Sequence, residues 1–166
     1  NEVKELLWVL ERDCKTEFII KTVNLTKQSK QEFEFSFENE SNEIAEYTVP
    51  IAYLYEPNAA ILKTGAFNSV STQLNIPKLH KHSHLYTSNT LIDFPGRRFK
   101  IEKSIPFNKK IFAKEKISKA NVTTRNFPIS VGEIRKKLKI KDGGDIYLFF
   151  TTDLNNIKII LVCFTA

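Results

Sequence analysis

The segment from residue 130 to the C-terminus constrains the fold most, because a helix start signal precedes two β-rich runs. Ser130 stands three residues before Glu133, which is the spacing of a capping box, and predicts a helix over residues 131–139 with a basic C-terminal end. The β-rich runs, residues 146–152 and 157–164, are separated by a short polar stretch that predicts a hairpin. We therefore expect helices packed against one sheet that ends in a hairpin.

The preceding residues add further expected elements. Glu56-Pro57 predicts the first turn of a helix, because proline at that position sacrifices no hydrogen bond and glutamate suits the positive helix end. Phe99, Ile101 and Ile105 are placed on one face of a strand, although Lys103 interrupts the row. The expected elements are a helix from residue 56 to the neighbourhood of residues 65–68, a second helical segment over 70–74, a strand over 97–105, an amphipathic helix over 107–116 and a strand over 120–126.

The first fifty residues predict β-structure. Residues 6–10, 17–25 and 31–38 have strand composition, and in the last of these Phe33, Phe35 and Phe37 alternate with polar residues. Short turns between the segments favour an antiparallel meander, followed by a polar stretch that forms a loop or short helix.

Charge divides the chain at Pro50. Residues 1–50 hold six Lys or Arg against eleven Asp or Glu, whereas residues 51–166 hold nineteen against eight. We therefore predict an α+β protein with two parts: an acidic β-rich region at 1–50 and a basic α/β domain at 51–166 with a mixed sheet.

Positive charge is densest between residues 97 and 141, where fifteen basic residues face three acidic ones. Such density is typical of a surface that binds a nucleic-acid phosphate backbone. Two other interpretations remain open: a solvated surface, or a face that docks the acidic first region.

The residues that carry the nucleic-acid hypothesis lie in three short stretches. Basic side chains at 97–98 and 135–139 are candidates for holding phosphates, while the sequence at 124–126 combines hydroxyl, guanidinium and amide groups that bind phosphate or base edges. Equally, the polar residues near 124–126 satisfy a turn before Pro128. The RNA-binding candidates are Arg97, Arg98, Thr124, Arg125, Asn126, Arg135, Lys136, Lys137 and Lys139.

A complete catalytic or cofactor motif is absent from the sequence. Nucleotide-binding enzymes place closely spaced glycines after a strand, but the one glycine pair, Gly143-Gly144, follows the expected helix and is interpreted as a C-cap and turn. His80, His82 and His84 would project to one side of an extended chain, yet no Cys or carboxylate accompanies them, so we expect no metal site. We accordingly assign no catalytic residue to this chain.

Compartment is indicated by two observations. The apolar runs are too short for a membrane helix, and no signal peptide is recognisable. Cys14 and Cys163 are far apart in sequence and fit reduced buried thiols better than a disulfide. We expect a soluble cytoplasmic protein without a membrane partner.

Because the chain starts with Asn and contains no Met, we also expect a fragment or a processed product.

Five stretches together resemble a known family. Residues 53–63, 84–88, 94–97, 121–128 and 138–144 read YLYEPNAAILK, HLYTS, FPGR, NVTTRNFP and LKIKDGG. In order and spacing they resemble the THUMP-like C-terminal domain of bacterial class I SAM-dependent methyltransferases. The acidic strands before them are similar to the small ferredoxin-like region that precedes this domain.

The resemblance implies a function that the residues alone do not supply. It implies that a Rossmann-type catalytic domain precedes this chain, that S-adenosylmethionine binds there, and that the present chain captures RNA such as tRNA or rRNA. The leading hypothesis is therefore a non-catalytic RNA-binding region of a methyltransferase. The alternative is a protein-interaction module that docks the catalytic domain in cis.

Overall fold

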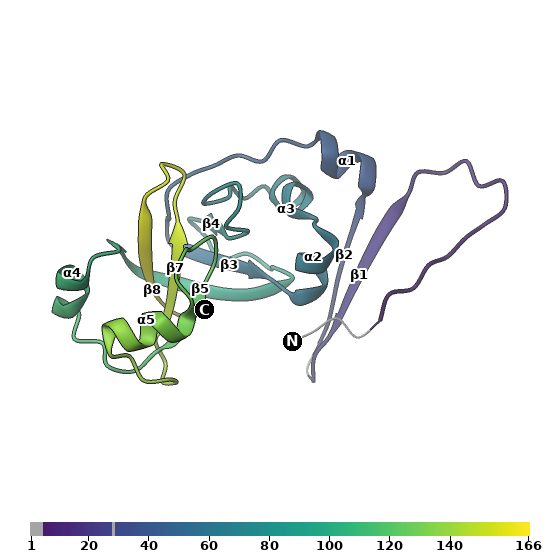
Figure 1. Ribbon diagram of the computed structural model, residues 1–166. Coiled ribbons are helices and arrows are strands. Elements are labelled where there is room, and N and C mark those ends of the chain that lie inside the picture. The colour runs from purple at the N-terminus through teal and green to yellow at the C-terminus, as the bar shows by residue number, and fades with distance from the viewer. Residues whose placement is uncertain (1–4, 28) are drawn as a thin grey trace.

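The computed structural model describes residues 5–27 and 29–166 and contains two sheets. The larger sheet has six strands in the order β4-β3-β5-β8-β7-β6, and the smaller pairs β1 with β2 (Figure 1). This mixture confirms the α+β prediction. The strands are β1 (Ile19–Leu25), β2 (Lys30–Ser36), β3 (Tyr53–Pro57), β4 (Tyr86–Ser88), β5 (Gly96–Pro106), β6 (Asn121–Thr124), β7 (Tyr147–Thr152) and β8 (Lys158–Thr165). The helices are α1 (Phe37–Asn42), α2 (Ala59–Thr64), α3 (Phe67–Leu74), α4 (Lys109–Lys114) and α5 (Val131–Leu138).

The large sheet is mixed, as predicted. Its neighbouring strands are antiparallel except for β6 and β7, which run parallel, and β7 and β8 form the expected C-terminal hairpin. The longest helices have eight residues, so no helix in the described ranges is long enough to cross a membrane.

A bulge in β5 changes which face of the sheet its side chains reach. Ile101 pairs with Cys163 and Lys103 with Val162, so Glu102 is the extra residue between them. Phe99 and Ile101 consequently pack with Leu161 on one face, whereas Ile105 joins the cluster on the opposite face. The prediction that all three apolar residues share one face was wrong, because a bulge shifts the two-residue alternation.

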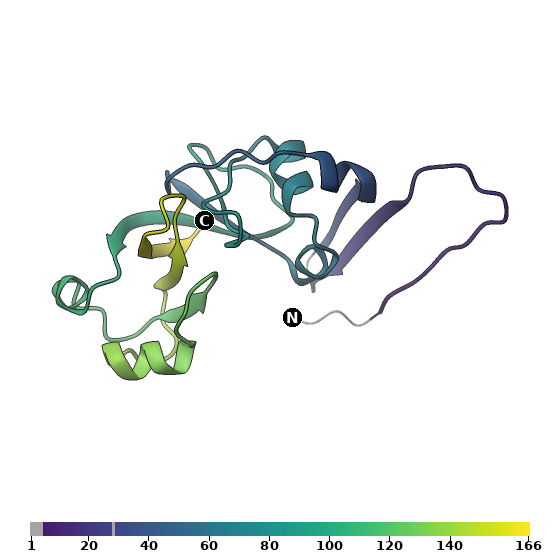
Figure 2. The same ribbon diagram turned by 45° about the horizontal axis from the view of Figure 1, so that its top comes forward.

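The two faces of the sheet are covered by different elements. Helices α4 and α5 lie over one face of β5, β7 and β8 (Figure 2). Phe112, Ile134 and Phe150 belong to the buried apolar cluster on this face. Leu79 and Leu85, from the loop before β4, cover the opposite face. Both faces of the central strands are therefore buried, which explains the nearly continuous apolar run in β8.

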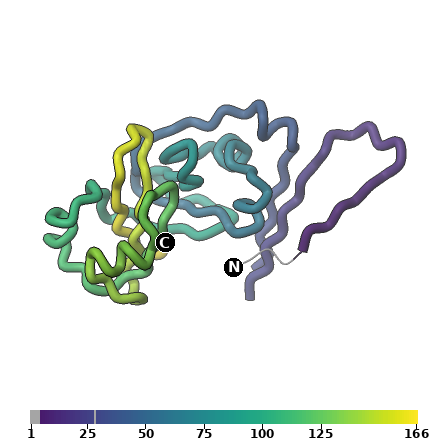
Figure 3. Tube along the Cα trace, viewed as in Figure 1, coloured from purple at the N-terminus to yellow at the C-terminus, as the bar shows by residue number. Residues whose placement is uncertain are grey.

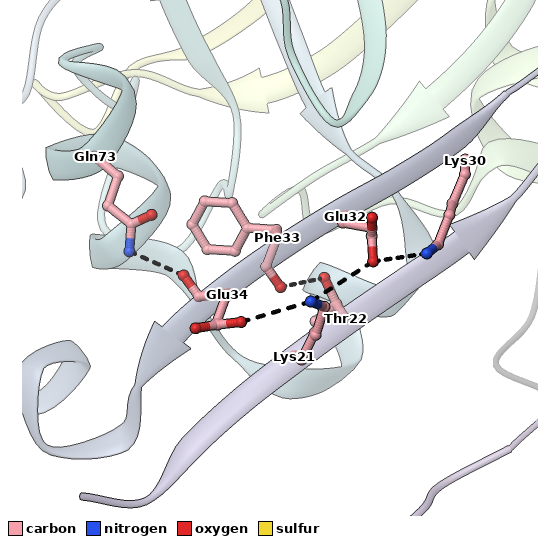
Figure 4. A network of polar contacts seen from close by, with 7 residues as sticks. All are labelled: Lys21, Thr22, Lys30, Glu32, Phe33, Glu34 and Gln73. Carbon is pink, nitrogen blue, oxygen red and sulfur yellow. Dashed lines mark hydrogen bonds and ion pairs between the residues drawn. The ribbon is translucent and has the colours of Figure 1, made fainter.

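The β1–β2 hairpin packs against helices α2 and α3. Phe33 and Phe35 join a cluster that includes Ile61 and Val70, and Gln73 Nε2 donates a hydrogen bond to the Glu34 carbonyl (Figure 4). On the hairpin itself, two lysines lie among the glutamates and the Thr22 hydroxyl donates to the Phe33 carbonyl (Figure 4). The acidic residues of this region are thus partly neutralised within the hairpin.

Residues 6–10 do not form the predicted strand. They run as an extended segment away from the rest of the molecule (Figure 3). Their large apolar side chains are exposed. Trp8, which is 64% exposed, stacks on Phe18 with 6.1 Å between ring centroids. The strand prediction was wrong here, because the described residues offer this segment no neighbouring strand to pair with.

Helix boundaries near proline and glycine also differ from the expectation. Glu56-Pro57 ends strand β3, and α2 begins two residues later behind Asn58, whose side chain accepts a hydrogen bond from the Ile61 N–H. Similarly, Phe37 begins helix α1 and does not continue the strand alternation. A proline that ends an antiparallel strand and a proline that begins a helix have the same local sequence signature.

The C-terminal helix has the predicted start but a different end. Ser130 and Glu133 form the capping box at the start of α5. Lys139, with φ +58°, forms its left-handed C-cap, whereas Gly143 and Gly144 lie in the following turn beside the Lys119 side chain. The glycine pair is therefore a turn and not the C-cap.

Candidate nucleic-acid interface

The structure divides the predicted RNA-binding residues between two places. Arg97 and Arg125 lie on the face of the sheet that contains Phe99 and Phe149, because Arg97 precedes Phe99 by two residues in β5. Lys136 and Lys137 lie on α5, which covers the opposite face. The candidates therefore form two separate sites.

The first place is built around the buried carboxylate of Glu56. One of its oxygens, Oε2, accepts hydrogen bonds from Nε (2.7 Å) and the terminal guanidinium nitrogen of Arg97. The other, Oε1, lies 2.9 Å from Nε and 2.8 Å from a terminal nitrogen of Arg125. We call these three residues the Glu56 cluster. Each carboxylate oxygen thus holds one guanidinium in charge-assisted hydrogen bonds.

Burial differs strongly within the Glu56 cluster. The Glu56 side chain is 4% exposed, whereas those of Arg97 and Arg125 are 47% and 33% exposed. The Arg97 guanidinium also lies over the Phe99 ring, with its carbon 5.4 Å from the ring centroid. A buried carboxylate requires such cationic partners, so both arginines are held primarily by the fold.

Glu56 was not among the residues predicted for this place. The sequence showed a glutamate before a proline and suggested a helix start, which is an exposed position. Its role follows from the sheet register, which sets Glu56 opposite Arg97, and from the end of β6, which brings Arg125 to the same point. No local signal in the sequence connects positions so far apart in the chain.

The other two predicted arginines are also paired. Arg98 lies 3.5 Å from the exposed carboxylate of Asp93, and Arg135 on α5 lies 2.5 Å from Asp142. The exposed Arg98–Asp93 pair contributes little to stability and leaves Arg98 available to other anions, whereas the Arg135 side chain is only 21% exposed.

Thr124 and Asn126 lie beside Arg125 at the end of β6. Thr124 is half-buried, and the Asn126 amide nitrogen lies 3.0 Å from Nδ1 of His80, while its carbonyl accepts a hydrogen bond from Thr152. Asn126 has φ +50°, a conformation that asparagine tolerates well. Asn126 is therefore held by contacts with His80 and Thr152, which lie far from it along the chain.

The histidines do not share one face of a strand. Residues 81–83 form a turn, in which His80 Nδ1 accepts a hydrogen bond from the His82 N–H and His80 Nε2 contacts Asn156. His84 stacks on Phe67, and burial lowers its pKa to about 4. No group of three or more metal-binding side chains was found within residues 5–27 and 29–166.

The second place is a surface rich in exposed lysines around α4 and α5, which lie side by side in Figures 1 and 2. We call it the lysine surface. Among the described residues no carboxylate forms an ion pair with any of its members, in contrast to the arginines. Its nine members are Lys109, Lys110, Lys114, Lys116, Lys119, Lys136, Lys137, Lys139 and Lys141.

Local structure fixes the α5 part of the lysine surface. The capping box orders the start of the helix, where hydrogen bonds from Ser130 lower the pKa of the Glu133 carboxyl. At the other end Lys137 extends over the Phe107 ring, with its nitrogen 5.1 Å from the centroid. Cationic side chains in the last turn are also stabilised by the helix dipole.

The cysteines take no part in either place. Cys14 is exposed near the N-terminus, and hydrogen bonding to Thr16 lowers its pKa. Cys163 is buried in β8, where desolvation raises its pKa to about 12. Both cysteines are free thiols, but the prediction that both are buried was wrong for Cys14.

Comparison with known families gives matches for most of the large sheet. The family described as a ferredoxin-like domain matches residues 53–95, and the family described as THUMP domain-like matches residues 96–164. The chain contains a ferredoxin-like domain followed by a THUMP-like domain. This order agrees with the resemblance seen in the sequence.

A solved structure extends the comparison. It is described as a "putative methyltransferase" from Porphyromonas gingivalis W83, and it superimposes with a TM-score of 0.84 and 38% sequence identity. The match covers 89% of this chain but only 38% of that one, so the present chain spans well under half the length of this neighbour. A comparison with curated proteins found no match. Together these findings relate the chain to THUMP-like domains and to part of a longer protein described as a methyltransferase.

The matched ranges differ from the division that the charge pattern suggested at residue 50. The ferredoxin-like match starts at residue 53, beyond the acidic segment, and the THUMP-like match starts only at residue 96. Net charge changes at Pro50 largely because residues 37–50 contain four glutamates and no Lys or Arg, but the β1–β2 hairpin and the ferredoxin-like domain share one apolar cluster. Charge composition is a property of surfaces and does not locate a domain boundary.

The two domains are closely joined. Strand β3 of the ferredoxin-like domain pairs with β5 of the THUMP-like domain, so one sheet runs through both. The Glu56 cluster lies at this junction, as does Ser83, whose hydroxyl donates to the Thr152 carbonyl at 2.9 Å. Arg97 and Arg125 therefore connect the domains.

Proposed function

We propose that this chain is the RNA-binding, non-catalytic region of a protein that methylates RNA with S-adenosylmethionine. The observation that carries the proposal is the lysine surface on the THUMP-like domain, where nine exposed lysines have no ion pair among the described residues. Unpaired lysines release counterions from a phosphate backbone when they bind it, which is the main source of RNA affinity. The proposed substrate is a structured RNA such as tRNA or rRNA in the cytoplasm.

The proposed cofactor site lies outside the present chain. Gly143 and Gly144 form a turn after α5, and the described residues include no glycine-rich turn between a strand and a following helix. The methyltransferase neighbour, which is much longer than this chain, supports placing the cofactor in another part of the protein.

Within the proposed interface, lysines and arginines have different roles. Lys136, Lys137 and Lys139 would bind phosphates directly, since they are exposed and have no ion pair among the described residues. Arg97 and Arg125 would instead hold the domain junction through Glu56, although their exposed edges face solvent. We therefore reassign Arg97 from phosphate binding to structural support of the domain junction.

Neutralising the α5 lysines tests the proposal. We expect Lys136→Gln/Lys137→Gln/Lys139→Gln to weaken RNA binding and to reduce the salt slope, the change of log K with log salt concentration, by about 2 to 3. Fluorescence anisotropy with labelled RNA across a salt series measures both quantities.

A matched control removes the same charge elsewhere. Lys15, Lys27 and Lys63 are exposed and lie away from α4 and α5, so their triple replacement by Gln should leave most of the RNA affinity intact. Equal losses in both triple variants would show that net charge alone drives binding. Absence of RNA binding by the unmodified chain at low salt would overturn the proposal.

A second candidate function, a protein-interaction module, is favoured by one observation. The side chains of Leu6, Leu7, Trp8, Val9 and Leu10 are all at least 64% exposed, and consecutive exposed apolar residues are a feature of protein contacts. Trp8 is the sole tryptophan of the chain, so its fluorescence reports directly on this segment. A blue-shifted emission after addition of a separately produced methyltransferase catalytic domain would support docking onto that domain, and unchanged emission would contradict it.

A further inference from the structure

A cavity of about 400 Å³ lies on the ferredoxin-like side of the molecule, away from the lysine surface. It is lined by side chains from α1, from the segment between α1 and β3, from the start of α3 and from the loop before β4, including Glu40, Tyr47, Phe67, Lys78, Lys81 and His82. Neither proposed function uses it. Its volume falls in the range of sites that hold small ligands.

Lys78 is the unusual residue of this cavity. It is only 2% exposed, yet among the described residues it has no carboxylate within ion-pair distance. Its ammonium donates one long hydrogen bond, of 3.3 Å, to the Lys81 carbonyl and lies 5.7 Å from the Phe67 ring centroid. Burial lowers the pKa of Lys78. An ammonium has three N–H donors, so two remain available to a ligand.

The nearby carboxylate of Glu40 is already committed to the protein backbone. Its Oε1 accepts hydrogen bonds from the N–H groups of Phe67 (3.0 Å) and Asn68 (2.8 Å), and its Oε2 accepts one from Ser69 (2.7 Å). These are the first N–H groups of α3, which has no side-chain cap of its own. The positive end of the helix therefore compensates the charge of Glu40.

The rest of the lining adds positive charge and an aromatic surface. Lys81 and His82 are exposed at the rim, and Tyr47 is 44% exposed. With Glu40 balanced by α3, the cavity has an excess of positive charge from Lys78 and Lys81. Such a combination favours a ligand that carries both an anionic group and a flat ring.

We propose that this cavity binds a nucleotide through its phosphate, with the phosphate on the Lys78 ammonium and the base against Tyr47. A phosphate provides several acceptor oxygens for Lys78 and a second negative charge for Lys81. The nucleotide is either a free mononucleotide or the phosphorylated end of an RNA strand, which present the same chemistry. The site is independent of the lysine surface.

The test compares AMP with adenosine, which lacks the phosphate. We expect the unmodified chain to bind AMP more tightly than adenosine in isothermal titration calorimetry. In Lys78→Met, which keeps the length of the side chain, AMP affinity should fall at least about tenfold, to the level of adenosine. Replacing a buried charge with an apolar group is compatible with folding, which a thermal denaturation curve checks.

Lys63→Met is the matched control, because Lys63 is exposed on α2 and outside the cavity. It should bind AMP like the unmodified chain. The proposal is overturned if the unmodified chain prefers AMP no more than adenosine, or if folded Lys78→Met retains the preference.

Two further measurements separate the ligand sources and the two proposals. The first compares a short RNA that has a 5′-phosphate with the same RNA that has a 5′-hydroxyl. If the unmodified chain prefers the 5′-phosphate and Lys78→Met does not, the ligand is the end of an RNA strand. AMP binding without this difference identifies a free nucleotide. The triple α5 lysine variant should bind AMP normally, so a failure of RNA binding leaves the cavity result interpretable.

Discussion

The Glu56 cluster and the lysine surface contain the same kind of charge in different surroundings. Arg97 and Arg125 each hold one oxygen of a carboxylate that is 4% exposed, at the junction of the two domains. Lys136, Lys137 and Lys139 are exposed around the end of α5, where the described residues supply no ion-pair partner. Positive charge near a buried carboxylate supports the fold, whereas unpaired positive charge at the surface remains available to a ligand.

The largest effect is expected from removing the carboxylate of the Glu56 cluster. Glu56→Ala should lower the free energy of unfolding by roughly 2 to 4 kcal/mol, because two guanidinium groups lose charge-assisted hydrogen bonds. Urea denaturation measures this. Asp93→Ala, which removes the exposed partner of Arg98, should cost less than about 0.5 kcal/mol. Equal losses of unfolding free energy in the two variants would show that the buried pair at the domain junction is no stronger than the pair at the surface.

A second large effect is expected from Gly96, where β5 meets β3. A Cβ at this position would lie 2.2 Å from the Glu56 carbonyl oxygen and 2.9 Å from the Pro57 Cα, both backbone atoms. Gly96→Ala should therefore destabilise the junction by about 2 to 3 kcal/mol. Gly132 in α5 has open space around its Cα, so Gly132→Ala should stabilise the protein by up to about 1 kcal/mol. Thermal denaturation of both variants measures these changes. A change of stability in the same direction in both would contradict the interpretation.

Replacing one charge in the Glu56 cluster and one on the lysine surface has a smaller expected effect. Arg97→Gln should lower stability by about 1 to 2 kcal/mol and leave the salt slope of RNA binding nearly unchanged. Lys137→Gln should reduce the slope by about 1 with little change in stability. Stability and RNA affinity measured on both proteins provide the comparison. A large reduction of the salt slope of RNA binding in Arg97→Gln would place the Glu56 cluster inside the RNA interface.

The smallest effect concerns the capping box that orders α5. Ser130→Ala should cost about 1 kcal/mol and should return the Glu133 pKa toward its ordinary value, since the Ser130 hydrogen bonds lower it. The contribution of this carboxylate is present above the pKa of the unfolded chain and is lost as pH falls through the lowered folded pKa. NMR titration of the Glu133 carboxyl in both proteins checks the direction. An unchanged titration would show that Ser130 does not hold Glu133.

The sequence predicted the second half of the fold better than the first. The capping box, the amphipathic helix of residues 107–116 and the C-terminal hairpin all correspond to observed elements, because their signals are local and need no distant partner. The strand at residues 6–10, the helix start at Glu56-Pro57 and the common face of Phe99 and Ile105 were wrong. In each case a neighbouring element, or the lack of one among the described residues, decides the outcome.

The candidate site shows the same division. The lysines of α5 were found because they gather within one helix whose ends are marked in the sequence. Glu56 was missed because its partners, Arg97 and Arg125, lie 41 and 69 residues further along the chain. Lys78 was likewise missed, since a single lysine in a stretch without periodicity gives no sign of burial.

By itself, the sequence determined the fold class, the family resemblance, the density of positive charge and the elements with local start and stop signals. Only the tertiary structure decided which of those charges are neutralised. The sheet register sets Glu56 opposite Arg97, and the end of β6 brings Arg125 to the same carboxylate. Composition counts charges along the chain, but the energy of each charge depends on burial and on partners that folding brings within a few ångströms.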